Sequence, residues 1–169
     1  MEEYIDEVDA SGRIISSHPK SLLKNKMFMH KVSLVIPRTA DGKFILSKRS
    51  KNKFPFPDTW CCAVGGKVSS GESEEEAAVR EMGEEIGINA SIMPVSSTVY
   101  DKGDYKGLFS VFTSQLPVNV EDMVLDEDEI QELGCFSLEE IGEMINEDKE
   151  QFAPTFRAVL KDFIDSSKK

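Results

Sequence analysis

The sequence is poor in cysteine and has no long apolar segment. Its cysteines are Cys61, Cys62 and Cys135. An odd number with two adjacent members suggests neither a disulfide framework nor a zinc site. No apolar run approaches the roughly 20 residues that span a bilayer, and the acidic start of the chain lacks the basic-then-apolar pattern of a signal peptide. We therefore expect a cytoplasmic protein with buried thiols and no membrane partner.

Positive charge is also scarce. Lysine and arginine total 20 against 31 acids, a net charge of −11, which argues against a nucleic-acid polymer as partner. Residues 121–150 are the most acidic part, with thirteen acids and the single base Lys149. The two histidines, His18 and His30, have no motif around them, and we expect them to be structural or exposed. We place the single tryptophan, Trp60, in the core.

A chain of 169 residues with 40% apolar residues can bury the core of one domain. Strand and helix patterns alternate along it, which is typical of an α/β protein. We expect a hairpin at 4–15 and a short helix or loop at 19–26. Strands are predicted at 32–37, 44–49, 60–64, 91–100, 108–115 and 130–136, with a turn at 101–104 and a loop at 116–124. Helices are predicted between Ser73 and Gly87 and at 137–145, followed by a last helix whose apolar face holds Phe156, Leu160, Phe163 and Ile164, with Phe152 just ahead of it.

The helix between Ser73 and Gly87 has clear end signals. Ser73 and Glu76 have the spacing of a capping box, and Gly87 suits the C-terminal stop. About 13 residues lie between them, which makes the helix roughly 20 Å long. Its core-facing stripe is predicted from apolar residues that recur at helical spacing, namely Ala78, Val79, Met82 and Ile86.

Another face of this helix is acidic. Glu81, Glu84 and Glu85 stand at i, i+3 and i+4, where like charges repel one another. A hard divalent cation, which prefers oxygen ligands, would offset this repulsion. A merely solvated acidic face is the alternative. Gly65 and Gly66, ahead of the helix, let the backbone pass close to a ligand and offer a carbonyl near the carboxylates.

Residues 66–88 resemble a known motif. Gly66, Glu72, Arg80-Glu81, Met82, Glu84-Glu85, Gly87 and Ile88 reproduce the Nudix box without a gap. The chain is therefore similar to the Nudix hydrolases. This resemblance implies an α/β/α sandwich, a mixed β-sheet between helices, in a single domain over residues 1–169. Residues 1–30 would form an N-terminal hairpin and lead-in, and residues 31–166 the Nudix core.

The resemblance also implies an activity. Nudix enzymes hydrolyse a nucleoside diphosphate linked to another moiety, or a similar organic diphosphate, with a divalent metal ion. Mg²⁺ is the expected ion, with Mn²⁺ as a substitute. The partner would then be a small-molecule diphosphate. Many Nudix hydrolases are dimers, so a homodimer is a further hypothesis.

Site roles follow from the same resemblance. The metal ligands would be Glu81 and Glu85, with Glu84 joining at a second ion and the Gly66 carbonyl contributing. Glu72 and Arg80 would hold the loop ahead of the helix through a buried ion pair. A general base from a later loop is also expected, and Glu129 is the first choice, with Glu127 second. An acidic loop tip without a catalytic role is the alternative.

A basic segment precedes the metal site. Residues 43–53 contain five bases and no acid: Lys43, Lys48, Arg49, Lys51 and Lys53. In so acidic a chain this contrast favours a positive lip that draws in a polyphosphate, although a solvated loop is the alternative. We expect Lys48, Arg49 and Lys53 to bind substrate, together with Lys67 just after the two glycines.

Two other activities stay open. The chain most resembles the Nudix subgroup that includes isopentenyl-diphosphate isomerase, but those isomerases carry a cysteine and a histidine where this chain has Gly65 and Lys67. Cys61 and Cys62 lie roughly 10–13 Å from Gly65 along an extended strand, so we expect neither to replace that cysteine. A silent ligand-sensing module would have lost box carboxylates, and none is lost.

Overall fold

The fold is built on a six-stranded mixed sheet. The computed structural model describes residues 1–103 and 105–169. The sheet contains β1 (Tyr4–Val8), β2 (Ile14–Pro19), β3 (His30–Val35), β6 (Val64–Lys67), β7 (Ile92–Lys102) and β8 (Tyr105–Ser114). Its order is β2-β1-β3-β8-β7, and β6 pairs with β3. β3 and β8 are parallel, and the other pairs are antiparallel.

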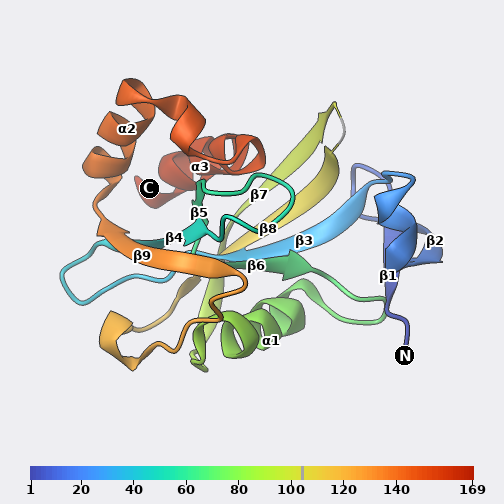
Figure 1. Cartoon of the computed structure of the whole chain (residues 1–169), viewed down its shortest axis with the longest axis horizontal. Helices are drawn as coiled ribbons and strands as arrows, with labels where there is room; N and C mark the ends of the chain where they lie inside the picture. Colours follow the sequence, from blue (N-terminus) through green and yellow to red (C-terminus); the bar gives the residue numbers. More distant parts are fainter. Residues whose placement is uncertain (104) are drawn as a thin grey trace.

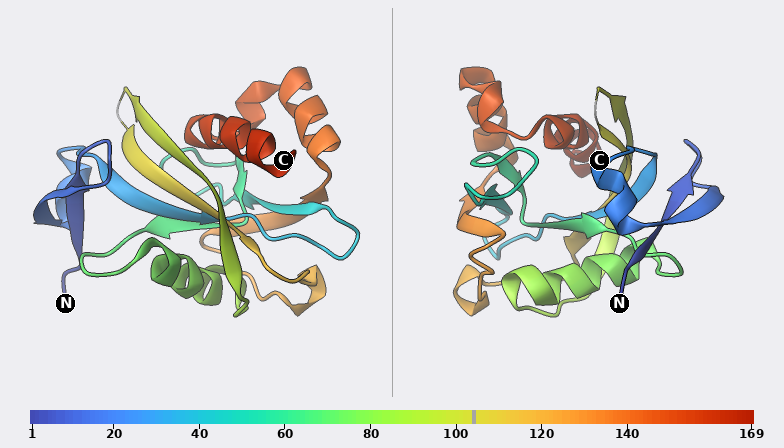
Figure 2. Two further views of the ribbon diagram at one scale, coloured as in Figure 1. Left: turned by 180° about the vertical axis from the view of Figure 1, so that it is seen from behind. Right: turned by 45° about the vertical axis from the view of Figure 1, so that its right-hand side comes forward.

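Helices cover both faces of this sheet, which confirms the predicted sandwich (Figure 1). α1 (Glu74–Ile86) packs on β6 and β3, whereas α3 (Pro154–Ser167) packs on β7 and β8 from the other side. α2 (Leu138–Glu147) lies beside α3, as both views in Figure 2 show. Short 3₁₀ helices, η1 (Lys20–Lys24), η2 (Val120–Asp122) and η3 (Lys149–Gln151), complete the chain. No helix in the described part is long and apolar enough to cross a membrane.

A second, three-stranded sheet was not predicted. It consists of β5 (Trp60–Cys62), β4 (Phe44–Arg49) and β9 (Ile130–Phe136) in antiparallel order. The single strand predicted at 60–64 is wrong, because the chain leaves this sheet at Ala63 and continues as β6 in the large sheet. Cys62 pairs with Leu46, whereas Val64 pairs with Val35. Alternating burial does not reveal which sheet a residue joins.

α1 has the predicted ends. The Ser73 hydroxyl accepts a hydrogen bond from the Glu76 N–H at 3.1 Å, and the Glu76 carboxylate accepts one from the Ser73 N–H at 2.8 Å. Gly87 ends the helix with φ of 67°, the left-handed conformation that glycine adopts without strain. The buried face includes the expected Met82 and Ile86, but also Glu85.

Other predicted elements are confirmed with shifted ends. The N-terminal hairpin is longer than predicted, because β2 continues to Pro19. A second capping box, Ser137 with Glu140, starts α2 as expected. The strands around the predicted turn at 101–104 are longer than expected, and Asp104 lies outside the described residues.

Trp60 and His30 are parts of the core. Trp60 is 9% exposed and meets the Phe136 ring edge-on at 5.3 Å between centroids. His30 is fully buried and donates its Nδ1–H to the Phe28 carbonyl at 2.9 Å. Burial lowers the pKa of His30 to about 4, so the ring is neutral near pH 7. His18 is half-buried beside Glu7.

Candidate metal and diphosphate site

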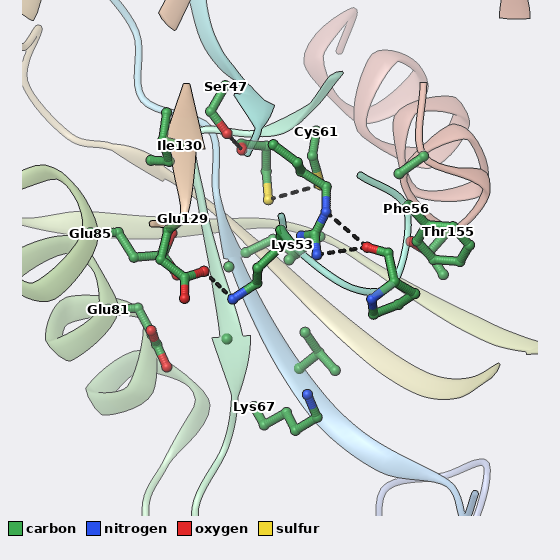
Figure 3. Close-up of a pocket in the computed structure, with 18 of the residues that line it drawn as sticks. Ser47, Lys53, Phe56, Cys61, Lys67, Glu81, Glu85, Glu129, Ile130 and Thr155 are labelled. Atoms are coloured by element: carbon green, nitrogen blue, oxygen red, sulfur yellow. Dashed lines mark hydrogen bonds and ion pairs between the residues drawn. The ribbon is translucent and has the colours of Figure 1, made fainter. Parts of the chain in front are cut away.

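A cavity of about 360 Å³ lies beside β6. Within the described residues, β6 pairs with β3 alone, so its other edge is available to line this space. α1 supplies acids on one side, where Figure 3 shows Glu81 and Glu85, and the opposite side holds Phe56 and Thr155. Lys53 projects between the two sides.

Arg80 fixes the loop between β6 and α1. Its Nε and Nη2 donate to the two Glu72 carboxylate oxygens at 2.8 and 3.0 Å, and Nη2 also donates to the Lys67 carbonyl at 3.3 Å. Glu72 in turn accepts the Ser69 N–H at 3.0 Å. The guanidinium lowers the pKa of Glu72 and is itself held charged, with its pKa raised. The two residues are therefore paired as a guanidinium and a carboxylate, and their role in holding the loop stays a prediction.

The Glu81 side chain lies directly against the Gly66 backbone. A Cβ on Gly66 would lie 2.0 Å from Glu81 Oε1, so with any other residue here the Glu81 side chain would have to move. Arg80 Nη1 donates to the same oxygen at 2.8 Å. Burial nevertheless raises the pKa of Glu81, because desolvation outweighs the charge of Arg80.

Neighbouring positive charge offsets the burial of the Glu85 carboxylate only in part. Glu85 is 9% exposed, and burial, reinforced by the negative charges of Glu81 and Glu129, raises its pKa to about 9. Lys53 and the Gly65 backbone N–H oppose this only in part. The carboxylates of Glu81, Glu85 and Glu129 line one cavity, and carboxylate oxygens are the ligands that a hard divalent cation prefers. Glu84 is different, since its side chain is 60% exposed and 3.5 Å from Arg80.

The carboxylates do not converge on one point. Among the described residues, no group of three or more Asp, Glu, His or Cys side chains is arranged to hold a metal ion. Glu81 is turned to Arg80, and Glu129 forms an ion pair with Lys53. The donor set and the close approach at Gly66 fit a divalent ion, provided that these side chains rotate away from their cationic partners.

Lys67 lines the same cavity. Within the described residues its side chain has neither an ion pair nor a hydrogen bond, and Figure 3 shows it below Lys53 in the view. Burial, reinforced by the positive charges of Lys20, Lys53 and Arg49, lowers its pKa. A cluster of cations that repel one another is relieved by an anion, which is what a phosphate supplies.

The basic segment contributes two of its five bases to the cavity. Arg49 and Lys53 line it, and Arg49 braces the following loop by donating Nε and Nη2 to the Pro55 carbonyl at 3.1 and 2.8 Å. Lys48 is outside the lining and lies 3.4 Å from Asp58. Lys43 lies 3.7 Å from Glu140. Of the two acids proposed as general base, Glu129 lines the cavity and Glu127 does not.

Sequence reasoning missed several lining residues. Glu3 and Lys20 come from the N-terminal segment and form an ion pair of 2.5 Å at the cavity. No local sequence pattern predicts that these two residues line the cavity, because it is the pairing of β1 with β3 that brings them to it. The apolar residues of the lining were also missed, among them Val32, Leu34, Phe54, Phe56, Tyr105 and Phe109.

The distance argument about the cysteines is wrong. Cys62 Sγ lies 3.1 Å from where a Cβ on Gly65 would stand, and both Cys61 and Cys62 line the cavity with their sulfurs 3.7 Å apart. The chain passes from one sheet to the other at Ala63, whereas the prediction assumed one extended strand. Contact with Cys61 and burial raise the pKa of Cys62, so it stays a thiol.

Comparisons with known proteins agree with this geometry. The model of the NUDIX domain family matches residues 28–159. A prenyl-diphosphate phosphatase of Methanosarcina mazei is 27% identical over 98% of each chain. An isopentenyl-diphosphate Delta-isomerase of Photorhabdus laumondii is 30% identical over 59% of this chain and 56% of its own. The crystal structure of a MutT protein from Methanosarcina mazei superposes with a TM-score of 0.68 and 25% identity, covering 86% of this chain and 98% of that one.

Proposed function

This chain belongs to the NUDIX domain family, and we propose that its cavity hydrolyses the diphosphate linkage of a small organic substrate with the help of a divalent metal ion. One observation carries the proposal. A buried carboxylate, Glu85, stands among further acids on one side of a cavity that is also lined by the cations Lys67, Lys53 and Arg49. A metal-bound diphosphate complements both charges at once.

Glu81 and Glu85 would hold the metal ion, with the Gly66 carbonyl, and Glu84 would join at a second ion. All are hard oxygen donors, so Mg²⁺ is the ion that we propose, with Mn²⁺ as a substitute. The bound ion would offset the negative charge of the phosphates and lower the pKa of a water molecule.

The chain's own residues have separate tasks in this proposal. Arg80 and Glu72 keep the loop rigid, so that the Gly66 carbonyl stays near the acids. Lys67 and Lys53 bind phosphate oxygens and orient the diphosphate. Glu129 accepts a proton from the attacking water, and for this Lys53 must transfer its contact from Glu129 to the substrate.

We also propose that residues 1–169 act as one domain, with residues 1–30 as a lead-in that supplies Glu3 and Lys20 to the cavity. The partner would be a small-molecule diphosphate in the cytoplasm and not a nucleic-acid polymer, in keeping with the net charge of −11. A homodimer is a separate hypothesis, which sedimentation of the purified protein would test.

Isomerisation of isopentenyl diphosphate is the second candidate. The Cys62 thiol beside Gly65 favours it, since moving a double bond requires a group that can give or take a proton at the substrate. Lys67 argues against it, because it stands where the isomerases carry a histidine ligand and its charge would repel a metal ion. We therefore place hydrolysis first.

A screen tests the proposal. The purified protein is incubated with isopentenyl diphosphate, nucleoside-diphosphate derivatives, dinucleotide polyphosphates and oxidised nucleotides, with Mg²⁺ or with a chelator, and the products are identified. Phosphate-containing hydrolysis products that need Mg²⁺ support it. Conversion of isopentenyl to dimethylallyl diphosphate at enzymic rates would support the isomerase instead.

A further inference from the structure

The cavity is lined in part by apolar side chains that hydrolysis of a diphosphate does not need. It is lined by Val32 and Leu34 of β3, Tyr105 and Phe109 of β8, and Phe54 and Phe56 of the loop between β4 and β5. We call these six residues the apolar chamber. Five of them belong to, or pack against, the core on the α3 side of the large sheet, whereas the carboxylates rise from α1 on the other side (Figure 3).

Two glycines separate the chamber from the carboxylates. A Cβ on Gly66 would strike Glu81 Oε1 at 2.0 Å, and a Cβ on Gly65 would meet Leu34 Cδ2 at 2.7 Å. Successive strand residues face opposite sides of a sheet, so the acids and Leu34 approach β6 from its two faces. Both line the same cavity, and within the described residues β6 pairs with β3 alone, so the cavity joins the two faces past the other edge of β6. The group attached to a diphosphate held at the acids can therefore reach the apolar chamber around this edge.

Neutral hydrogen-bonding side chains are few in the described lining. They are the hydroxyls of Ser47, Tyr105 and Thr155, without any Asn or Gln. Ser47 already donates to the Cys62 carbonyl at 2.7 Å. A ribose placed among the six residues of the apolar chamber would have few partners for its hydroxyls there, which is unfavourable. A hydrocarbon group loses no hydrogen bonds there, and its burial is favourable.

Phe54 lies at the rim of the chamber and is 88% exposed. A large aromatic side chain left in water at the mouth of a cavity is a surface for a ligand to cover. Phe109 of the same lining is already buried, since it is 4% exposed and stacks on Tyr105 at 6.0 Å between centroids. A hydrocarbon group in the chamber would therefore remove apolar surface from water chiefly at Phe54.

We infer that the substrate is a diphosphate ester of an apolar alcohol, and that Phe54 is a specificity-determining residue that covers its hydrocarbon tail. The inference rests on the proposed hydrolysis and selects one of the substrate classes open to it. A cavity of about 360 Å³ is near the small end of ligand sites, so the tail is short.

The test compares kcat/KM with Mg²⁺ for dimethylallyl diphosphate, geranyl diphosphate and ADP-ribose. The wild type should prefer geranyl diphosphate to ADP-ribose by at least about tenfold, the scale on which apolar pockets discriminate. Phe54→Ala should lower kcat/KM for geranyl diphosphate by about tenfold, with a smaller effect on the shorter dimethylallyl diphosphate. Phe54→Leu should restore most of the loss. Leu116→Ala, which removes an apolar side chain that is 75% exposed away from this cavity, is the matched control and should change nothing.

The outcomes separate the two proposals. A preference for ADP-ribose, or an equal effect of Phe54→Ala on all three substrates, would overturn the apolar-tail inference and leave the hydrolase standing. If the wild type hydrolyses no diphosphate at all, the proposed function fails and the inference fails with it. A tail-length effect lost in Phe54→Ala and regained in Phe54→Leu supports both.

Discussion

Replacing Glu85 by glutamine should make the metal-free protein more stable and the enzyme nearly inactive. In the fold the pKa of Glu85 is raised from 4.5 to about 9 by burial. A carboxyl group with a raised folded-state pKa contributes stability that is complete below about pH 4.5 and is lost as the pH rises to about 9. Glutamine has the shape of the protonated acid and does not titrate.

The magnitude follows from the same values. At pH 7 the Glu85 carboxylate must take up a proton when the wild type folds. Because pH 7 is 2.5 units above the unfolded pKa of 4.5, this protonation costs about 3 kcal/mol of folding free energy. The glutamine variant avoids this cost, so its Tm in a chelator should be higher by roughly 6–12 °C. The difference should vanish near pH 4.5 and grow toward pH 9. With saturating Mg²⁺ the order should reverse, because the ion stabilises only the wild type.

Thermal denaturation between pH 4.5 and 9, with chelator and with Mg²⁺, is the assay. Glu84→Gln is the control for stability, since its side chain is 60% exposed and solvent screens its charge. The turnover of Glu85→Gln should fall by at least about 100-fold, as for the loss of a metal ligand. A variant that is less stable than the wild type in chelator at pH 8, or whose advantage does not change with pH, would refute the reasoning.

Three further predictions follow from the same geometry. Gly66→Ala should displace Glu81, because the new Cβ would lie 2.0 Å from Oε1, and the Mg²⁺ needed for half-maximal activity should rise by at least about tenfold. Lys67→Gln should raise KM by about tenfold and lower the salt dependence of kcat/KM, whereas Lys51→Gln, outside the cavity lining, should do neither. Glu72→Gln should leave Arg80 without its paired carboxylate and lower kcat more than Tm, since the loop loses its position while α1 keeps its cap; a normal kcat would contradict the positioning role.

The helix and its caps could be predicted because their signals are local. Ser73 and Glu76 act on each other within one turn, and Gly87 supplies its own left-handed conformation. The charged half of the cavity is similarly local, because Glu81 and Glu85 share one helix. What remained hidden was their electrostatics, since the burial of Glu85 depends on strands that precede the helix.

The other half of the site depends on chain pairing that one sequence does not reveal. The change of sheet at Ala63 moved Cys62 next to Gly65, contrary to the expectation from an extended strand. The hairpin at the N-terminus brought Lys20 to the cavity for the same reason. No local pattern singles out Phe54, and only the assembled sheets show it in the lining of a cavity.

Hydrolysis in oxygen-18-labelled water tests the central claim most directly. The protein is incubated with geranyl diphosphate and Mg²⁺, with a parallel sample in chelator, and the products are examined by mass spectrometry. The proposed mechanism predicts one label in one of the two phosphate products, and no turnover in chelator. Label-free products, or turnover that persists in metal-free protein, would contradict a metal-dependent attack of water on the diphosphate.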